Sequence, residues 1–259
     1  MQKVLPVTLI ITVLVFLSAC QKEQPEILDQ HFLKKTVSRW GDSTTVTQYF
    51  YDDQNRLSSI STSDRNGQEE MNRKELTYDQ FGKLAKVTQT WYDGQSHTYQ
   101  FKYDAHNRIM ERLSEPIAAT GAVMKNTYTY DTKGRLIADS VYSSSINGVA
   151  EFRIYAYDEK DNMIESQIFY NTSTGVQLES AATYEYDNNK NPYSSLGKYF
   201  YFVSMDYYRD DFLSRNNIVK IKTRRTVVTS NYTYEGFFPK IKATSSDDDG
   251  RVTTLEYFY

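Results

Sequence analysis

The chain of 259 residues carries 30 Lys and Arg against 33 Asp and Glu, and this net charge of −3 gives no electrostatic reason to expect binding to nucleic acid. Its single cysteine excludes an intramolecular disulfide. Hydrophobic residues make up only 39% of the sequence, yet it contains 23 Tyr and 13 Phe. Because tyrosine has a high strand propensity and a polar end, this composition favours a half-exposed β-sheet.

Residues 1–20 predict a lipoprotein signal peptide. Lys3 supplies the positive charge, and the apolar run from Val4 to Leu17 is too short to span a bilayer comfortably. The run ends in Leu-Ser-Ala-Cys, which resembles a bacterial lipobox, so Cys20 is expected to be acylated after cleavage before it. Several acyl chains together anchor a protein stably. A plain signal peptide with an incidental cysteine is the alternative, and the absence of any other cysteine favours the lipid anchor.

Residues 21–30 predict a polar tether. Its start, Gln21-Lys22-Glu23, resembles the export signal that sends such lipoproteins to the cell surface, although Gln24 and Pro25 depart from the more acidic form. We therefore expect attachment to the outer membrane through the lipid anchor. Whether the protein faces the cell surface or the periplasm is left open.

Residues 31–259 predict a single β domain built from repeated hairpins. In the clearest unit, Tyr128–Leu136, Asp131 suits the first position of a type I turn, and Gly134 suits the left-handed residue of a three-residue hairpin loop. Asp131 and Arg135 should face each other as an opposite-charge pair worth roughly 0.2–1 kcal/mol. The Tyr before the turn recurs every 25–29 residues, at Tyr51, Tyr78, Tyr103, Tyr130, Tyr157 and Tyr186.

A second set of turns is predicted between these units, at residues 65–67, 92–94, 120–121, 146–148 and 174–175. The chain is therefore predicted to be all-β, an antiparallel meander curled into a barrel or rolled shell, since closure removes exposed strand edges. We expect this barrel to lie in water. The face opposite the tyrosines carries Glu75, Lys102 and Glu185, and the tyrosine face of a later strand carries Glu151 and Arg153, so neither face suits lipid.

The repeat breaks at Pro192, which cannot donate a hydrogen bond to a central ladder. Leu196, Phe200, Val203 and Tyr207 have helical spacing and would suit a short helix or a plug across one end, while a strand fits nearly as well. Residues 193–217 are therefore predicted as an irregular or helical insertion. The sheet is predicted to resume with strands over 218–230, 232–235, 238–244 and 252–259.

The unit Tyr-x-Tyr-Asp-x-x-Gly-Arg-Leu of residues 128–136 is similar to the YD repeat of RHS-type shell proteins. Residues 40–259, including Asn191-Pro192 and the later Ser214–Asn217, resemble more closely a family of short Bacteroidetes-type lipoproteins of unknown function with a porin-like fold. The resemblance implies an all-β fold and brings no catalytic residues. A shell that encloses a toxin is disfavoured, because the copies are few and no cargo domain is present.

No motif predicts a metal, a cofactor or a catalytic residue. The three histidines, His31, His97 and His106, lie far apart without metal-ligand spacing. The repeated aspartates are explained as turn formers, and Asp247–Asp249 is explained better as a solvated turn than as a calcium site. No nucleophile elbow, phosphate loop or dinucleotide fingerprint occurs. A carboxylate pair of a glycosidase needs no sequence motif, so it stays an alternative.

The only two tryptophans, Trp40 and Trp91, flank turns of the second set, and Tyr92 follows the latter. They are expected at the same end of the sheet, about four strands or roughly 19 Å apart at ~4.8 Å per strand. Exposed aromatic residues on a rim are a platform for sugar rings or a protein partner. The more usual role of such residues is to close the end of a core.

These features together predict a monomeric, non-catalytic, lipid-anchored envelope protein. Its expected partner is an extracellular glycan or another envelope protein, with Trp40, Trp91 and Tyr92 as the candidate ligand platform and Cys20 as the site of lipid attachment. The alternative is a glycan-acting hydrolase whose carboxylates meet in the cavity of the barrel.

Overall fold

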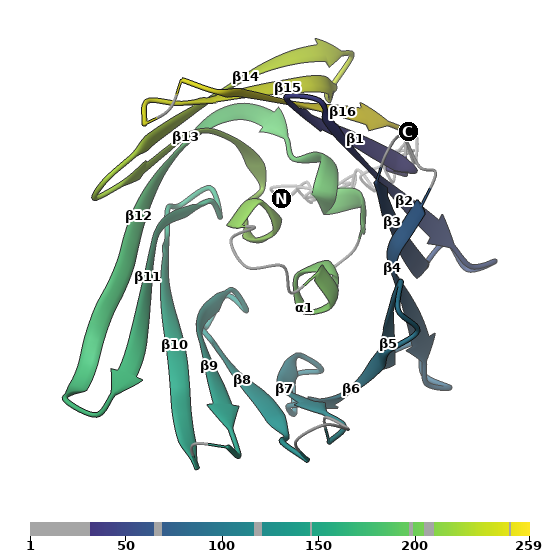
Figure 1. Ribbon diagram of the computed structural model, residues 1–259, viewed down its shortest axis with the longest axis vertical. Coiled ribbons are helices and arrows are strands. Elements are labelled where there is room, and N and C mark those ends of the chain that lie inside the picture. The colour runs from purple at the N-terminus through teal and green to yellow at the C-terminus, as the bar shows by residue number, and fades with distance from the viewer. Residues whose placement is uncertain are drawn as a thin grey trace, which may run out of the picture. The chain divides into compact units, whose positions relative to one another are not determined.

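Sixteen strands follow one another around a closed barrel, each paired antiparallel with its neighbours in sequence, and β16 pairs with β1 (Figure 1). The structure, a computed structural model, describes residues 32–64, 69–116, 121–145, 147–196, 199–204, 210–248 and 250–259. The strands are β1 Lys35–Trp40, β2 Ser43–Tyr51, β3 Leu57–Asp64, β4 Glu69–Tyr78, β5 Leu84–Trp91, β6 Ser96–Tyr103, β7 Ile109–Ser114, β8 Met124–Tyr130, β9 Leu136–Ser143, β10 Gly148–Tyr157, β11 Met163–Thr172, β12 Gly175–Lys190, β13 Asn216–Thr223, β14 Val227–Glu235, β15 Phe238–Ser246 and β16 Val252–Phe258. The predicted all-β meander is confirmed, and it closes.

The predicted turn of the repeat is confirmed by its hydrogen bonds, its ion pair and its strand register. The amides of Lys133 and Arg135 both donate to Asp131 Oδ1 at 2.9 Å, and Arg135 Nε lies 2.7 Å from Asp131 Oδ2. Tyr130 pairs with Leu136, with a bulge in the register beside it. The left-handed residue of the five units has φ of 58° at Asn55, 75° at Gly82, 60° at Asn107, 83° at Gly134 and 65° at Asp161.

Each of these units, called YD units below, is also bonded to the unit before it. The hydroxyl of Tyr130 donates to the carbonyl of Ile109 at 2.6 Å, and the guanidinium of Arg108 lies 4.7 Å from the centre of the Tyr130 ring. Other tyrosines repeat the bond at 2.7–2.8 Å, from Tyr51 to Leu33, Tyr78 to Leu57, Tyr103 to Leu84 and Tyr157 to Leu136. These contacts run around the barrel as a ladder that sets the spacing between hairpins.

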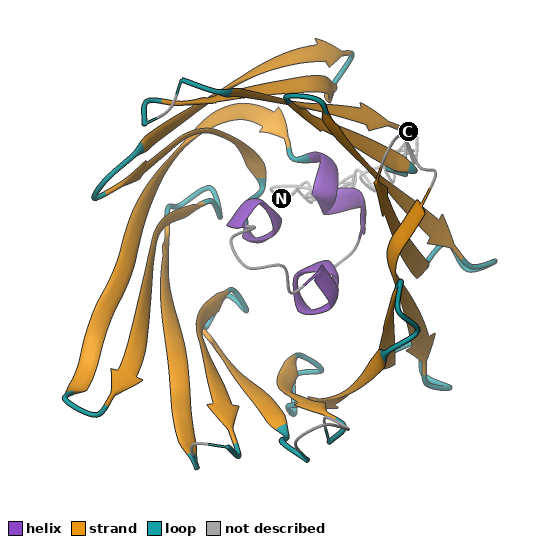
Figure 2. Cartoon of the chain, viewed as in Figure 1, coloured by secondary structure: helices purple, strands orange, loops and turns teal. Residues whose placement is uncertain are grey.

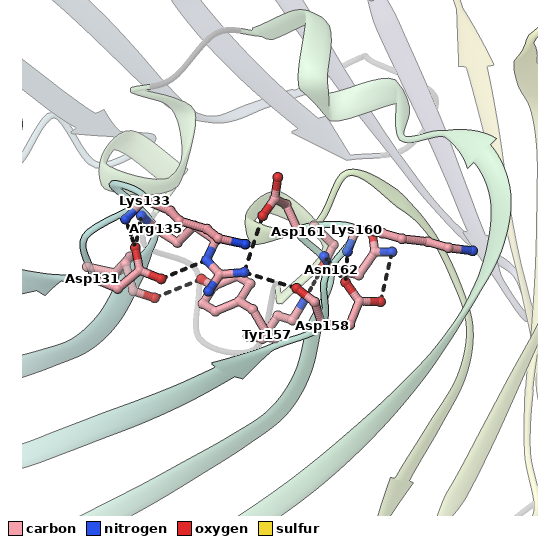
Figure 3. A network of polar contacts seen from close by, with 11 residues as sticks. Asp131, Lys133, Arg135, Tyr157, Asp158, Lys160, Asp161 and Asn162 are labelled. Carbon is pink, nitrogen blue, oxygen red and sulfur yellow. Dashed lines mark hydrogen bonds and ion pairs between the residues drawn. The ribbon is translucent and has the colours of Figure 1, made fainter.

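Figure 3 shows one step of this ladder. Arg135 binds Asp131 of its own unit, donates to the carbonyl of Asp158 at 3.0 Å in the next unit, and lies 4.9 Å from the ring centre of Tyr157. It also forms an ion pair with Asp161 at 3.2 Å. One arginine therefore joins two consecutive turns.

The sixth YD unit contains the predicted insertion inside its turn. Tyr186 pairs with Ile218, as Tyr130 pairs with Leu136, and the amide of Asn217 donates to Asp187 Oδ1 at 3.2 Å. The residues in between include the short helices η2 Pro192–Leu196, α1 Phe200–Ser204 and η3 Asp210–Leu213, which lie inside the ring of strands (Figures 1 and 2). The helical alternative for this segment is confirmed.

The inserted helices fill the end of the barrel that carries the Tyr-Asp turns, called the YD end below. Phe200 lies 4.4 Å from Phe212 and 5.9 Å from Tyr193 between ring centres, and Phe202 meets Tyr128 of the wall edge-on at 4.8 Å. The leucines that close the turns belong to the same two buried clusters, among them Leu33, Leu57, Leu84 and Leu136. Burial of this apolar surface, at about 25 cal/mol per Å², holds the insertion in place.

A seventh hairpin is formed by β14 and β15, where Tyr234 pairs with Pro239. The barrel closes through an eighth YD unit assembled from two distant segments. Phe258 pairs with Lys35 and Tyr257 with Thr36, in the register in which Thr129 pairs with Ala138 and Tyr128 with Asp139. The amide of Lys34 donates to the carbonyl of Phe258 at 2.8 Å. Tyr259 and Leu33 therefore hold the positions of Tyr130 and Leu136, without the turn between them.

The prediction of a single strand over residues 218–230 is wrong. β13 ends at Thr223 and β14 begins at Val227. The amide of Thr223 donates to the carbonyl of Thr226 at 2.9 Å, and the amide of Thr226 donates back to Thr223 Oγ1 at 3.0 Å. Threonine hydroxyls compete with the ladder in this way, so the segment becomes a hairpin, and β14 runs unbroken to Glu235.

Of the second set of turns, residues 65–67, 120 and 146 lie outside the described residues, as do Cys20, the predicted tether and His31. The described part of the chain contains no helix that is long and apolar enough to cross a membrane.

Candidate binding site

Both tryptophans lie at the end of the barrel opposite the YD end. Trp40 is the last residue of β1 and Trp91 the last of β5, so both strands end at turns of the second set, as predicted. Trp40 is 50% exposed and the neighbouring Tyr92 is 84% exposed. We call this end, defined by Trp40, Trp91 and Tyr92, the tryptophan rim.

The register places both tryptophans on the inner face of the barrel. Trp40 lies four residues beyond Thr36, which is opposite the buried Tyr257, and side chains two or four residues apart share a face. In the same way Trp91 lies four residues beyond the core residue Val87. Both indole rings therefore belong to the inner wall at the rim.

The two tryptophans differ in their surroundings. Trp40 is half exposed, and the guanidinium of Arg251 lies 5.4 Å from its ring centre, so its indole is not part of the buried core. Trp91 is half-buried and meets His97 edge-on at 4.9 Å. Tyr92 follows Trp91 in the turn. The three side chains share one rim, and β2, β3 and β4 separate the two strands that carry the tryptophans.

The inner face below the rim is polar and half-buried. By the same alternation, six side chains on β2 to β6 point inward there: Thr45, Thr47, Thr62, Asn72, Gln89 and His97. Hydroxyl and amide groups of this kind can both donate and accept hydrogen bonds. The tryptophan rim thus leads to a polar wall, whereas the YD end is filled with apolar side chains.

Charged residues appear where the polar wall meets the inserted helices. Asp139 on β9 is buried and accepts hydrogen bonds from Tyr155 at 2.6 Å and from Tyr201 of α1 at 2.9 Å. Burial raises the pKa of the Asp139 carboxyl, although the nearby Arg153 and the two hydroxyl donors act in the opposite direction. This network bonds the insertion to the wall.

Three more charged residues continue this layer. Glu151 and Arg153 on β10 form an ion pair at 2.6 Å. Arg112 on β7 is buried, donates to Asn126 at 2.9 Å and lies 4.4 Å from the ring centre of Tyr99. Its Nε has no hydrogen-bond partner in the described part of the chain. Burial lowers the pKa of the Arg112 guanidinium. Burying a charge with incomplete pairing costs free energy. The packing of the surrounding fold must therefore hold this layer of charged residues in place.

The sequence predicted the rim but not this buried layer as a unit. It placed Glu151 and Arg153 on the tyrosine face, which is the inner face observed. Asp139 could have been found from the turn register, because a bulge after Leu136 places it opposite Tyr128. No sequence pattern marked Arg112. Its contact with Asn126 depends on the pairing of β7 with β8, which the turn of the repeat does not determine.

The histidines contribute no metal site among the described residues, where no group of three or more His, Cys, Asp or Glu side chains is placed to hold a metal ion. His97 packs against Trp91, and the amide of His106 donates to Asp104 in a turn. Asp249 of the acidic turn lies outside the described residues.

The ring of YD units defines a closed YD-repeat barrel. The teneurin YD-shell family matches residues 64–204, more than half of the chain, and the chain belongs to this family. In fold the chain is similar to a porin-like protein from Bacteroides uniformis, at a TM-score of 0.55 and 15% identity over 87% of this chain and 95% of that one. A porin-like protein from Bacteroides vulgatus gives a TM-score of 0.56 and 14% identity over 88% and 98%. No curated protein matches the chain in sequence.

Proposed function

We propose that the protein is a non-catalytic binding protein that takes a glycan at the tryptophan rim. The observation that carries this proposal is the exposure of Trp40 and Tyr92 at the end of the barrel opposite the one that the described residues of the insertion fill. Aromatic faces stack on sugar rings, and the hydroxyl and amide groups of the polar wall suit sugar hydroxyls. An envelope protein partner at the same rim is the second ligand class.

The hydrolase alternative requires carboxylates that a substrate can reach. Asp139 and Glu151 are the inward-facing carboxylates of the buried layer, and they are only 3% and 6% exposed. Asp139 accepts two tyrosine hydroxyls, and Glu151 is paired with Arg153. Both groups are engaged by the wall and the insertion, which supports a structural role for these two carboxylates.

A glycan-array screen tests the binding proposal. The double variant Trp40→Ala, Trp91→Ala should lose at least tenfold in affinity, because about 1.4 kcal/mol of lost contact corresponds to a factor of ten. The matched control is Phe81→Ala, Phe237→Ala, which removes two aromatic rings that are 75% and 82% exposed in turns at the YD end. Equal affinity of wild type and the tryptophan variant would refute the proposal, and cleavage of a bound glycan would favour the hydrolase.

We further propose that Cys20 is acylated and anchors the barrel to the outer membrane. Leu33 lies at the YD end, so the chain enters the barrel at the end opposite the tryptophan rim. Incorporation of a labelled fatty acid into wild type but not into Cys20→Ser checks the anchor, and labelling of both proteins would contradict it.

We also propose that the barrel wall faces water and that the protein is a monomer. Its outer face carries the ion pairs Lys102–Glu111 at 2.6 Å and Lys220–Glu185 at 2.8 Å, and charges in the middle of a lipid-facing strand are costly. Residues 21–259 expressed alone should therefore be monodisperse in buffer by light scattering. A strict requirement for detergent would overturn this proposal.

A further inference from the structure

Three YD units place a guanidinium between their own aspartate and the tyrosine of the next unit. In each pair Nε lies 2.7 Å from the aspartate Oδ2, and the guanidinium lies 4.2–4.9 Å from the ring centre. The arginines are Arg56 over Tyr78, Arg108 over Tyr130 and Arg135 over Tyr157. The repeat thus contains a recurrent internal binding site for arginine, made of one carboxylate and one phenol ring.

The sixth YD unit has the aspartate but not the arginine. Its residue at that turn position is Asn217, and Asp187 accepts hydrogen bonds from neutral groups of Asn189, Asn217 and Tyr234. Within the described residues Asp187 forms no ion pair. The neutral replacement is also incomplete, because the buried Asn217 Oδ1 has no hydrogen-bond partner among the residues that the structure describes. The negative charge that an arginine balances in three other units therefore has no arginine beside it here.

The fifth unit also lacks the arginine, and its Asp158 forms no ion pair among the described residues, but the asparagine of that unit is bonded differently. Asn162 holds the corresponding position there, and it is buried and bonded on both sides to Asn216, at 2.9 Å and 3.1 Å. Asp158 of that unit accepts the amides of Lys160 and Asn162 in the ordinary turn.

A groove of about 400 Å³ opens beside Asp187. The groove forms because the pairing of β13 with β14 stops at Lys220, although both strands continue towards the YD end. The seventh hairpin is shifted by two residues, since Tyr232 rather than Tyr234 donates to the carbonyl of Ile218, at 3.0 Å. Tyr234 is thereby carried to Asp187. The groove is lined by Glu185, Asp187, Asn189, Val219, Lys220, Thr229, Ser230, Asn231, Tyr232 and Tyr234.

We propose that this groove, called the seam groove below, binds an arginine side chain supplied by a partner polypeptide. It offers the two components that hold arginine elsewhere in the ring: the carboxylate of Asp187 and the rings of Tyr232 and Tyr234, whose centres are 6.1 Å apart. Glu185 is already paired with Lys220 at 2.8 Å, so Asp187 gives the groove its net negative charge.

The chemistry favours a guanidinium over other cations. Arginine presents a planar fork of donors that matches a carboxylate and also stacks on aromatic faces, whereas an ammonium is a compact and strongly hydrated charge. The volume lies in the lower part of the roughly 300–1,000 Å³ typical of ligand pockets, which suits one side chain with its flanking backbone. This site lies in the wall near the YD end and is independent of the tryptophan rim.

The test uses the peptide acetyl-Gly-Arg-Gly-amide and its citrulline analogue, which has nearly the same shape but no charge. Each is titrated to about 10 mM into ¹⁵N-labelled protein of residues 21–259, which includes the compact unit Phe32–Tyr259. The arginine peptide should give saturable shifts of the Asn189, Asn231 and Thr229 amides, with an affinity at least tenfold above that of the citrulline peptide. Equal affinities, or no saturable shift, would overturn the proposal.

Two variants locate the interaction. Asp187→Asn should weaken the arginine peptide at least tenfold, while Asp158→Asn, which removes the same charge from the neighbouring unit, should leave its affinity unchanged. Unchanged affinity in Asp187→Asn would also overturn the proposal. Should Asp187→Asn fail to fold, the comparison of the two peptides on wild type still decides, because it needs no variant.

Discussion

Gly134 offers a direct measure of how strongly the turn of a YD unit constrains the barrel. Its φ is +83°, and no atom lies within 4 Å of the place that a Cβ would take. In Gly134→Val the added side chain therefore meets no neighbour, and the cost is that of the left-handed backbone alone, about 1–3 kcal/mol. For a domain of this size ~1 kcal/mol corresponds to roughly 2–4 °C in Tm. We expect a loss of about 2–12 °C in thermal unfolding followed by circular dichroism.

The matched control is Gly134→Asn. Asparagine occupies the same turn position in two other units, at φ of 58° in Asn55 and 60° in Asn107. This variant should lose less than half as much stability as Gly134→Val. Equal melting temperatures of wild type and Gly134→Val would refute the assignment of the left-handed residue, and equal losses in both variants would show that the cost is not one of backbone conformation.

Two further predictions concern the ladder and the buried layer. Tyr130→Phe removes the 2.6 Å hydrogen bond to the Ile109 carbonyl but keeps the ring beneath Arg108, so urea unfolding should show a loss of about 1 kcal/mol, and an unchanged midpoint would contradict it. Because burial raises the pKa of Asp139, the folded state binds its proton more readily than the unfolded state. The stability of wild type relative to Asp139→Asn should therefore fall as the pH rises above about 4, where an unfolded aspartate titrates, and a constant or rising difference would exclude this linkage.

The parts of the fold that depend on short-range chemistry could be predicted from sequence. The bond from the Arg135 amide to Asp131, the pairing of Tyr130 with Leu136 and the left-handed Gly134 all lie within one turn. Local residues and the repeat therefore determine them. The position of Trp40 and Trp91 at one rim follows as well, because alternate turns of a meander lie at the same end.

The contacts between distant segments could not be predicted in this way. Asn217 completes the turn that begins at Asp187, although the whole insertion lies between them, and no sequence pattern marks it as the fifth residue of that turn. The position of Arg135 over Tyr157 likewise depends on the offset between hairpins, which the period of 25–29 residues does not fix. The seam groove arises from a two-residue shift of this offset, and so it became visible only in three dimensions.

In the eighth unit, β16 and β1 pair as the two strands of a YD unit that lacks its turn. A circular permutant tests this interpretation. Tyr259 and Leu33 hold the positions of Tyr130 and Leu136, so the five residues of the turn 131–135 should join them without altering the register. New ends can be opened at the exposed Asp93–Gly94 in the turn between β5 and β6, at the opposite end of the barrel.

The permutant should fold with the circular dichroism spectrum of residues 32–259 in their natural order. It should also unfold at a similar or higher temperature, because the added turn supplies the aspartate hydrogen bonds and the left-handed glycine that the split unit lacks. A matched permutant with the same ends but five added serines has the length of the turn without its chemistry, and it should be less stable. If the two permutants unfolded at the same temperature, the junction would be an ordinary loop and not the missing turn of a YD unit. If neither folded, the pairing of β1 with β16 as an eighth hairpin would be refuted, since such pairing requires only that the two segments meet in this register.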